Sequence, residues 1–153
     1  KGKRQIKRTI SFAFYFRRPA SKVKGKGNGT FDFLGFTFYW SKSRRGYWVI
    51  KKKTAGRRLS RFLKRQWQWC RENRHEPIKE QHERLCSKLR GYYLYFGVRS
   101  NYKALEVVFE FIEKAWRYWL SRRSHKGGIS WAKFEKIRTS FVLPKPRIVH
   151  NNI

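Results

Sequence analysis

Acidic residues, sulfur-containing residues and long apolar runs are all scarce in this sequence. Its 153 residues include 9 Asp and Glu, 2 Cys and no Met, and Asp32 is the only aspartate. Metal-dependent phosphoryl-transfer sites need several converging carboxylates, so a site of that kind is not expected here. Cys70 and Cys86 are too far apart in sequence for the Cys-x-x-Cys pairs of common zinc sites. We therefore predict neither a metal site nor a cofactor in this chain.

The scarcity of cysteine and of long apolar runs also bears on the cellular location of the protein. Two cysteines without a disulfide pattern are typical of a reducing compartment, so we expect a cytoplasmic protein. No apolar run approaches the roughly 20 residues of a membrane-spanning helix, and no contact with a membrane is expected. The sequence begins at Lys1 without a methionine. We interpret it as a truncated part of a longer protein, and a degenerate remnant is the alternative.

Positive charge and aromatic rings are abundant instead. Lys and Arg number 39, the formal net charge at pH 7 is +30, and 18% of the residues are aromatic. A disordered basic tail has few aromatic residues, whereas this chain has enough of them to build a core. A folded protein with so large a positive charge is expected to bind a polyanion, above all a nucleic acid.

The first third of the chain predicts a basic leader followed by strands. Residues 1–30 contain many Lys and Arg and no acid. Residues 31–40 are rich in strand formers, residues 41–46 are polar, and residues 47–50 start a return strand that ends at the lysines of residues 51–53. This pattern predicts a β-hairpin over residues 31–53. Gly35 within its first strand suggests a bulge or a close backbone approach.

The remaining residues predict helices. Apolar residues recur at helical spacing over residues 56–73, 77–96 and 100–123. Pro77 suits the first turn of the second helix, Gly97 its end, and Ser100 or Asn101 the N-cap of the third. Ser130 is expected to cap a short fourth helix before an extended, proline-containing tail. The expected fold is α+β and mainly α: an N-terminal β-hairpin, a three-helix bundle, and a short C-terminal helix with its tail.

The charge is unevenly distributed over these helices. The first helix has no acid before Glu72, so its outer face is uncompensated. The third helix instead offers Glu110–Lys114 and Glu113–Arg117 as favourable i,i+4 pairs, and we interpret that face as ordinary solvent-exposed surface. Like charges repel at the same spacing on the first helix, which favours an anionic partner there.

Five blocks of the sequence resemble, in order and spacing, those of group II intron reverse transcriptases. Residues 31–38 (FDFLGFTF) are similar to the hairpin that closes the palm, and residues 89–97 (LRGYYLYFG) to the signature of the maturase-specific domain, or thumb. Residues 116–124 (WRYWLSRRS), 129–134 (ISWAKF) and 141–150 (FVLPKPRIVH) are similar to later blocks of a bacterial subgroup. The resemblance divides the chain into a leader that matches the end of the palm poorly (1–30), a palm–thumb hairpin (31–53), thumb helices (54–123) and a C-terminal part (124–153).

The resemblance implies both a function and a limit to it. Thumbs of this family bind intron RNA to assist splicing, and they grip the template–primer during reverse transcription. The implied partners are group II intron RNA, an RNA–DNA duplex, and the palm and fingers of the same polypeptide. The family's Tyr-Ala-Asp-Asp motif does not occur in this sequence, and the Mg²⁺ that it holds would belong to the missing palm. We therefore expect a bacterial RNA-binding domain with roles in splicing and intron mobility, and no enzymatic activity of its own.

The candidate RNA contacts are basic side chains together with two tyrosines. The basic candidates are Lys51, Lys52, Lys53, Arg57, Arg58, Arg61, Lys64, Arg65, Arg90, Arg122, Arg123 and Arg147. Tyr93 and Tyr95 fall beside the apolar stripe of the second helix, where they either stack on bases or pack on a neighbouring element. Gly91 costs about 1 kcal/mol in a helix interior, which a close approach of a helix or of RNA would justify. His82 lies on the stripe, and we expect it to be packed and hydrogen-bonded.

Two other interpretations stay open. In the first, the chain is the end of a complete RNA-directed DNA polymerase, and an upstream reading frame with the Asp-Asp motif would favour it. In the second, the chain is a generic basic nucleic-acid-binding protein. The second alternative treats the five ordered blocks as chance.

Overall fold

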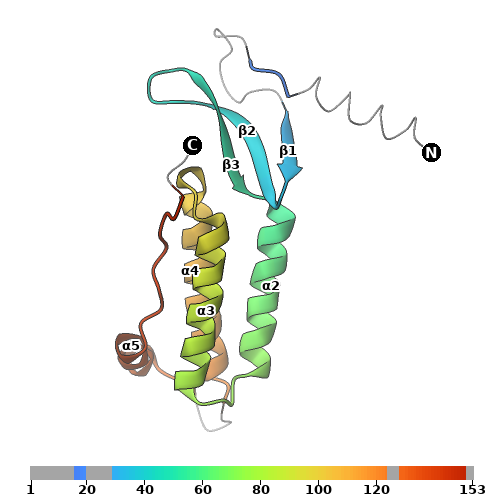
Figure 1. Ribbon diagram of the computed structural model, residues 1–153. Coiled ribbons are helices and arrows are strands. Elements are labelled where there is room, and N and C mark those ends of the chain that lie inside the picture. The colour runs from blue at the N-terminus through green and yellow to red at the C-terminus, as the bar shows by residue number, and fades with distance from the viewer. Residues whose placement is uncertain (1–15, 20–28, 124–127, 151–153) are drawn as a thin grey trace, which may run out of the picture. The chain divides into compact units, whose positions relative to one another are not determined.

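The computed structural model describes residues 16–19, 29–123 and 128–150 of the chain. It divides into two compact units, Lys1–Ala55 and Gly56–Ile153. Among the described residues, the strands belong to the first unit and the helices to the second (Figure 1). The predicted α+β class, with the sheet first and the helices after it, is confirmed. In the described residues, no helix combines the length and the apolar character that crossing a membrane requires.

Three antiparallel strands form the sheet of the first unit. They are β1 (Thr30–Phe33), β2 (Phe36–Lys42) and β3 (Trp48–Thr54), in the order β1-β2-β3. The predicted first strand is therefore two strands, because Leu34 and Gly35 turn the chain between them. Both residues have positive φ, 49° and 79°, as in the two-residue type I′ turns that join closely paired strands. Gly35 thus serves a tight turn and not a bulge.

In the second unit, the described residues form three long helices, one short helix and one 3₁₀ turn. They are α2 (Gly56–Glu72), α3 (Ile78–Phe96), η1 (Arg99–Asn101), α4 (Tyr102–Leu120) and α5 (Trp131–Ser140). The predicted bounds of α2 and α3 differ from these by no more than one residue at either end. Asn101 directly precedes α4, as one of the two predicted N-caps, whereas α4 ends at Leu120 and not at the predicted residue 123.

The predicted helix caps have mixed outcomes. Ser130 caps α5 as expected, since its Oγ accepts a hydrogen bond from Lys133 N at 3.3 Å. Asn101 precedes α4, but its side chain makes no cap hydrogen bond. Its Nδ2 donates instead to Phe96 O at 2.9 Å, so it fastens the end of α3. The side-chain amide of Asn101 bonds to α3 and not to α4, because the 3₁₀ turn places it beside the last carbonyls of α3.

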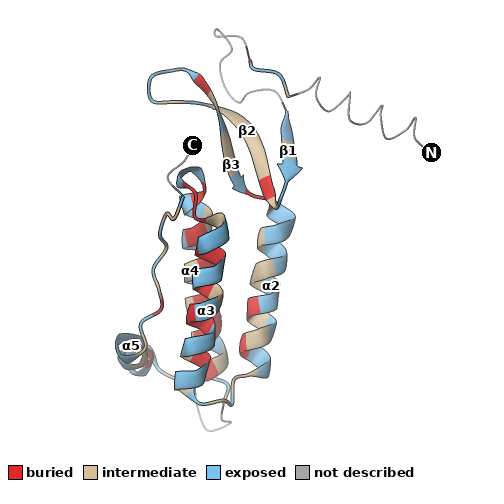
Figure 2. Ribbon diagram, in the orientation of Figure 1, coloured by how far each residue is buried: buried red, intermediate tan, exposed pale blue. Residues whose placement is uncertain are grey.

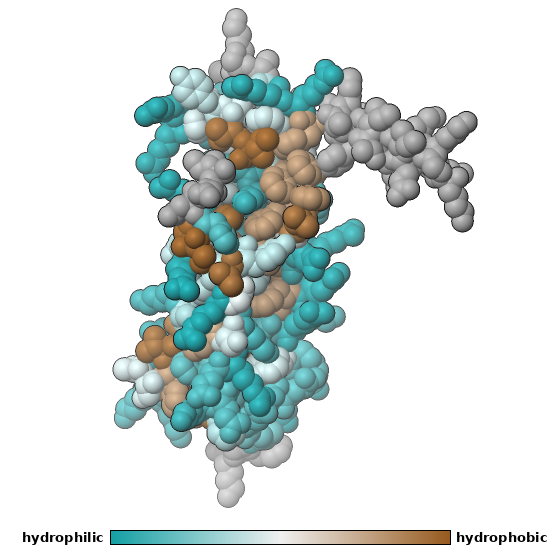
Figure 3. Space-filling model, viewed as in Figure 1, coloured by the Kyte–Doolittle hydropathy of each residue, from teal (hydrophilic) through white to brown (hydrophobic). Residues whose placement is uncertain are grey.

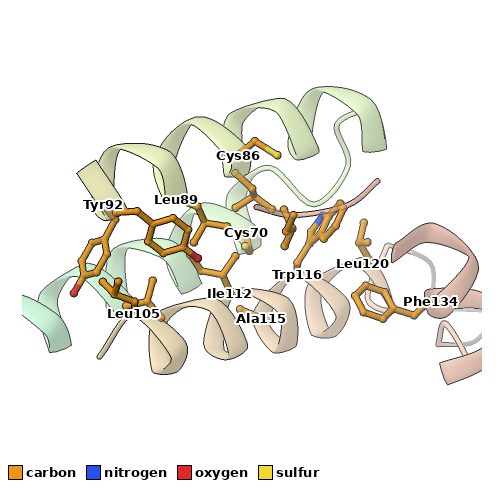
Figure 4. Close-up of a cluster of buried hydrophobic side chains, with 14 residues drawn as sticks. Cys70, Cys86, Leu89, Tyr92, Leu105, Ile112, Ala115, Trp116, Leu120 and Phe134 are labelled. Atoms are coloured by element: carbon orange, nitrogen blue, oxygen red, sulfur yellow. The ribbon is translucent and has the colours of Figure 1, made fainter. Parts of the chain in front are cut away.

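The core of this unit lies among the three long helices (Figures 2 and 4). Side chains of α3 and α4 point toward one another, and Phe134 of α5 closes one end of the cluster. Its buried members are Cys70, Leu85, Cys86, Leu89, Tyr92, Tyr93, Leu105, Val108, Ile112, Ala115, Trp116, Leu120, Phe134 and Leu143. One polar pair is enclosed with them: Trp116 Nε1 donates to Gln81 Oε1 at 2.9 Å. Gln81 Nε2 in turn donates to Glu76 O at 2.8 Å, so both groups are satisfied.

Residues 141–150, which we call the C-terminal segment, run in extended form along the helices (Figure 1). His82 Nε2 donates to Val142 O at 2.9 Å, and Tyr93 Oη donates to Pro144 O at 3.1 Å. At its far end, Val149 N donates to Gly97 O at 2.8 Å. The expectation of a packed, hydrogen-bonded His82 is confirmed, and the segment forms one wall of the core beside α3.

The two cysteines are free thiols inside this core. Burial raises the pKa of Cys70 to about 12, and burial also raises the pKa of Cys86. Since the thiolate is the reactive form, native chain at pH 8 should react with Ellman's reagent about a hundredfold more slowly than unfolded chain. Stopped-flow absorbance in buffer and in guanidinium chloride measures both rates. A thiol that reacts equally fast in both conditions would show that the cluster in Figure 4 is open.

Candidate nucleic-acid interface

One face of α2 carries only cations and neutral side chains up to Glu72. Its apolar positions, such as Leu59, Phe62 and Leu63, turn toward the core cluster. The opposite positions are exposed and bear six positive charges, and Figure 3 shows mainly hydrophilic side chains on the α2 side of the helical unit. We call these six side chains the basic face: Arg57, Arg58, Arg61, Lys64, Arg65 and Arg71.

In the part of the chain that the structure describes, no carboxylate forms an ion pair with the basic face. The ion pairs formed among the described residues join Arg84 to Glu76, Lys114 to Glu110, and Arg138 to both Glu113 and Glu135. None of them involves the basic face, and the one acid of α2, Glu72, accepts from Gln68 instead. Each like-charge neighbour at i,i+4 costs a few tenths of a kcal/mol. The face therefore carries a local positive field that a polyanion would relieve.

A group of aromatic rings borders the basic face. Trp67 of α2 lies 4.9 Å from Tyr118 and 5.4 Å from Trp119 of α4, measured between ring centroids. Arg71 lies over Trp119 at 5.9 Å, and Arg122 over Tyr118 at 3.9 Å. We call Trp67, Tyr118 and Trp119 the aromatic rim. Single-stranded nucleic acids bind where cations and stacking rings alternate, so the rim extends what the basic face can do.

The aromatic rim and Arg71 were missed in the sequence analysis. By helical spacing, Trp67 falls on the inner stripe of α2 and Tyr118 on a second apolar strip of α4 that includes Phe111, and neither position by itself indicates a binding residue. The structure places Trp67 at the border of the two faces of α2, against that strip. These rings come together only because of the way in which α2 and α4 are aligned against each other. The spacing of residues within either helix does not indicate that alignment.

The three lysines of β3 are divided between the two faces of the sheet. Lys51 and Lys53 share a face with their partners Tyr39 and Thr37, whereas Lys52 is on the face of Phe38. Lys53 Nζ lies over the Tyr39 ring at 5.6 Å, and Lys52 Nζ lies over the Phe36 ring at 5.3 Å. The three lysines therefore do not form one patch on the sheet, and their assignment as RNA contacts stays a prediction. The lysines lie within the return strand and alternate, because a strand sends neighbouring side chains to opposite sides.

The basic candidates that follow α2 in the sequence differ in how far their side chains are exposed to solvent. Arg90 on α3, Arg122 after α4 and Arg147 on the C-terminal segment are exposed. Arg123 is partly buried, and its guanidinium donates to the backbone carbonyls of Arg74 and Glu76. Burial lowers the pKa of Arg123. Arg123 thus holds the connection between α2 and α3, and its assignment as an RNA contact is corrected for that physical reason.

The two tyrosines proposed for stacking also differ. Tyr93 is fully buried, and burial raises the pKa of its hydroxyl, which donates to Pro144 O. Of the two alternatives for Tyr93, packing on a neighbouring element is confirmed, because the C-terminal segment covers this side of α3, and base stacking is excluded. Tyr95 is 51% exposed and meets Phe96 edge-on at 4.7 Å, so it stays a candidate.

Gly91 has open space around it, and Asp32 has one hydrogen-bond partner across the sheet. A Cβ at Gly91 would meet nothing within 4 Å, so packing by another part of the described chain does not explain the glycine. Asp32 accepts a hydrogen bond from Thr37 Oγ1 on β2, and no ion pair among the described residues includes it. Among the described residues, no three His, Cys, Asp or Glu side chains come together in a way that could hold a metal ion.

The interface therefore consists of the basic face, the aromatic rim with Arg122, and the isolated exposed arginines Arg90 and Arg147. Its chemistry suits phosphate neutralisation beside base stacking. No protein-family model, curated protein or solved structure matches this chain.

Proposed function

We propose that this chain is an RNA-binding module, equivalent to the maturase-specific thumb of group II intron proteins, that binds intron RNA to assist splicing. The observation that carries the proposal is the basic face: six exposed cations on one helix, without a carboxylate partner among the described residues, beside partly exposed aromatic rings. RNA uses both features, since its phosphates release counterions on binding and its unpaired bases stack. The sequence blocks that resemble the thumb support the choice of intron RNA.

In this proposal the chain contributes binding and no catalysis. In a full-length protein the same helices would grip the template–primer, and the polymerase carboxylates with their Mg²⁺ would belong to the palm. The single aspartate is hydrogen-bonded across the sheet, which suits a structural role for it.

The test is a salt titration of RNA binding, followed by fluorescence anisotropy of a labelled group II intron domain. If about six to eight phosphates are neutralised, log K should fall against log salt with a slope near −5 to −7 between 50 and 400 mM KCl. A slope near zero, or no binding at 50 mM, would refute the proposal.

A second RNA separates intron recognition from generic charge attraction. The control is an unrelated structured RNA of the same length, titrated under the same conditions. The thumb proposal expects tighter binding of the intron domain at every salt concentration, because contacts beyond phosphates add to the affinity. Equal affinities throughout would favour the generic basic protein.

A further inference from the structure

Trp131, the first residue of α5, leaves one face of its indole open. Its other face is covered by Arg117 of α4, whose Cζ lies 3.4 Å from the ring centroid. Phe134 meets the ring edge-on, with centroids 6.4 Å apart and planes at 74°. Nevertheless 60% of Trp131 is exposed. With one face under the guanidinium, that exposed area must include the opposite face.

Other residues already fasten α5 to α4. Phe134 is buried and contacts Trp116 at 6.2 Å between centroids. Arg138 of α5 forms an ion pair with Glu113 of α4 at 3.4 Å. The open face of Trp131 adds no contact to this attachment, so it is available to a ligand.

Arg117 carries a charge that the described chain does not neutralise. The predicted i,i+4 partner of Arg117 is Glu113, but Glu113 pairs with Arg138. In the part of the chain that the structure describes, no ion pair includes Arg117, and its Nε is buried without an acceptor. The guanidinium is held by the indole, and the two groups present a flat cationic stack.

The surroundings of this stack favour an anionic ligand. Among the described residues at the end of α4 and on α5, no ion pair includes Arg117, Arg122, Lys133 or Lys136, and the acid of α5, Glu135, is already paired with Arg138. A single ring face is too small for a protein interface, whereas it matches one nucleobase, whose phosphates the basic residues would attract. An unpaired nucleotide combines both properties.

We infer that Trp131 is a stacking residue for an unpaired nucleotide, backed by Arg117. The inference rests on the proposed RNA-binding function and names a second contact for the same ligand. Residues Glu113 and Arg117 of α4 meet α5, whereas Phe111 and Tyr118 of α4 meet Trp67 of α2. The stack therefore lies on the opposite side of α4 from the basic face, as Figure 1 shows for α5 and α2. The ligand class that reaches both is a structured RNA with a single-stranded extension.

The experiment compares Trp131→Leu with wild type on two labelled RNAs, a blunt hairpin and the same hairpin with a ten-nucleotide single-stranded extension. Leucine keeps an apolar side chain over the Arg117 stem but offers no ring. We expect about tenfold weaker binding of the extended hairpin and less than a twofold change for the blunt hairpin. Trp131→Phe, which keeps a ring, should fall between them. An equal loss on both RNAs, or no loss on either, would overturn the inference.

Photochemical cross-linking of the wild-type chain tests the same inference without the variant, so a folding defect of Trp131→Leu does not affect the result. An extension carrying 5-iodouracil should cross-link to the peptide that contains Trp131, as identified by mass spectrometry. If cross-links form elsewhere and none at this peptide, the inference fails even if the variant is unstable. If wild type binds neither hairpin, the proposed function fails. If it binds both with a steep salt slope and Trp131→Leu is neutral, only the stacking site fails.

Discussion

Replacing Arg61 and Arg65 by glutamine should lower the affinity of the chain for RNA about sixtyfold at 0.1 M salt. Each neutralised phosphate contributes close to 0.9 to the slope of log K against log salt, so two lost contacts remove nearly two units of slope. Both residues are at the centre of the basic face and have no carboxylate partner among the described residues. The anisotropy titration described above measures both quantities on the same samples.

The matched control is Lys103→Gln with Lys114→Gln on α4. It removes the same net charge from exposed positions, and Lys114 already pairs with Glu110 at 3.7 Å. We expect a loss of only a few fold and an unchanged slope, since these lysines act through the distant field alone. Equal losses from both double variants would mean that total charge, and not the basic face, sets the affinity. Melting temperatures should not fall in the α2 variant, because it removes a like-charge i,i+4 pair.

Gly97→Ala should lower the free energy of unfolding by about 2–3 kcal/mol. Gly97 has φ −75° and ψ 58°, the inverse γ-turn conformation, and Val98 N donates to Phe96 O across it at 2.8 Å. A Cβ here would overlap the Tyr93 carbonyl oxygen and lie 3.0 Å from Arg147 O and 3.1 Å from Val149 N. These are backbone atoms, which cannot rotate away, so the C-terminal segment would be displaced. Urea unfolding and limited proteolysis of residues 141–150 measure the two effects.

Gly91→Ala is the control for this variant, on the same helix. Open space surrounds that position, and the substitution should raise stability by about 0.5–1 kcal/mol through helix propensity alone. If Gly97→Ala were as stable as wild type, the C-terminal segment would not be held in the way described. If Gly91→Ala gained stability but bound RNA more weakly, RNA rather than the chain itself would account for the glycine.

Elements defined by local patterns could be predicted from the sequence. The three long helices, the Ser130 cap and the end of α3 at Gly97 follow from spacing and cap chemistry, and the structure agrees. The outer face of α2 could also be predicted, because an amphipathic helix whose one acid is its last residue, Glu72, has a single uncompensated basic side.

Features that depend on residues far apart in the sequence could not be predicted from it. The run of strand formers around Leu34 predicts one long strand, since leucine is unusual at positive φ and does not mark a type I′ turn. Tyr93 is buried by Pro144, which lies 51 residues away, and Arg123 binds carbonyls 47 and 49 residues away. Helical periodicity carries no information about such partners. For the same reason the aromatic rim became visible only in the packed helices.

The C-terminal segment also fixes the order in which the growing chain can mature. Its bonds to Tyr93 and His82 span 51 and 60 residues. During synthesis α3 therefore leaves the ribosome well before the C-terminal segment that covers it. Until that segment is made, the side of α3 that carries Tyr93 stays exposed or is bound by a chaperone. Helices form within microseconds, whereas closure over such separations is slower. Completion of this side of the bundle is thus timed by the synthesis of residues 142–150 and not by that of the helix they cover.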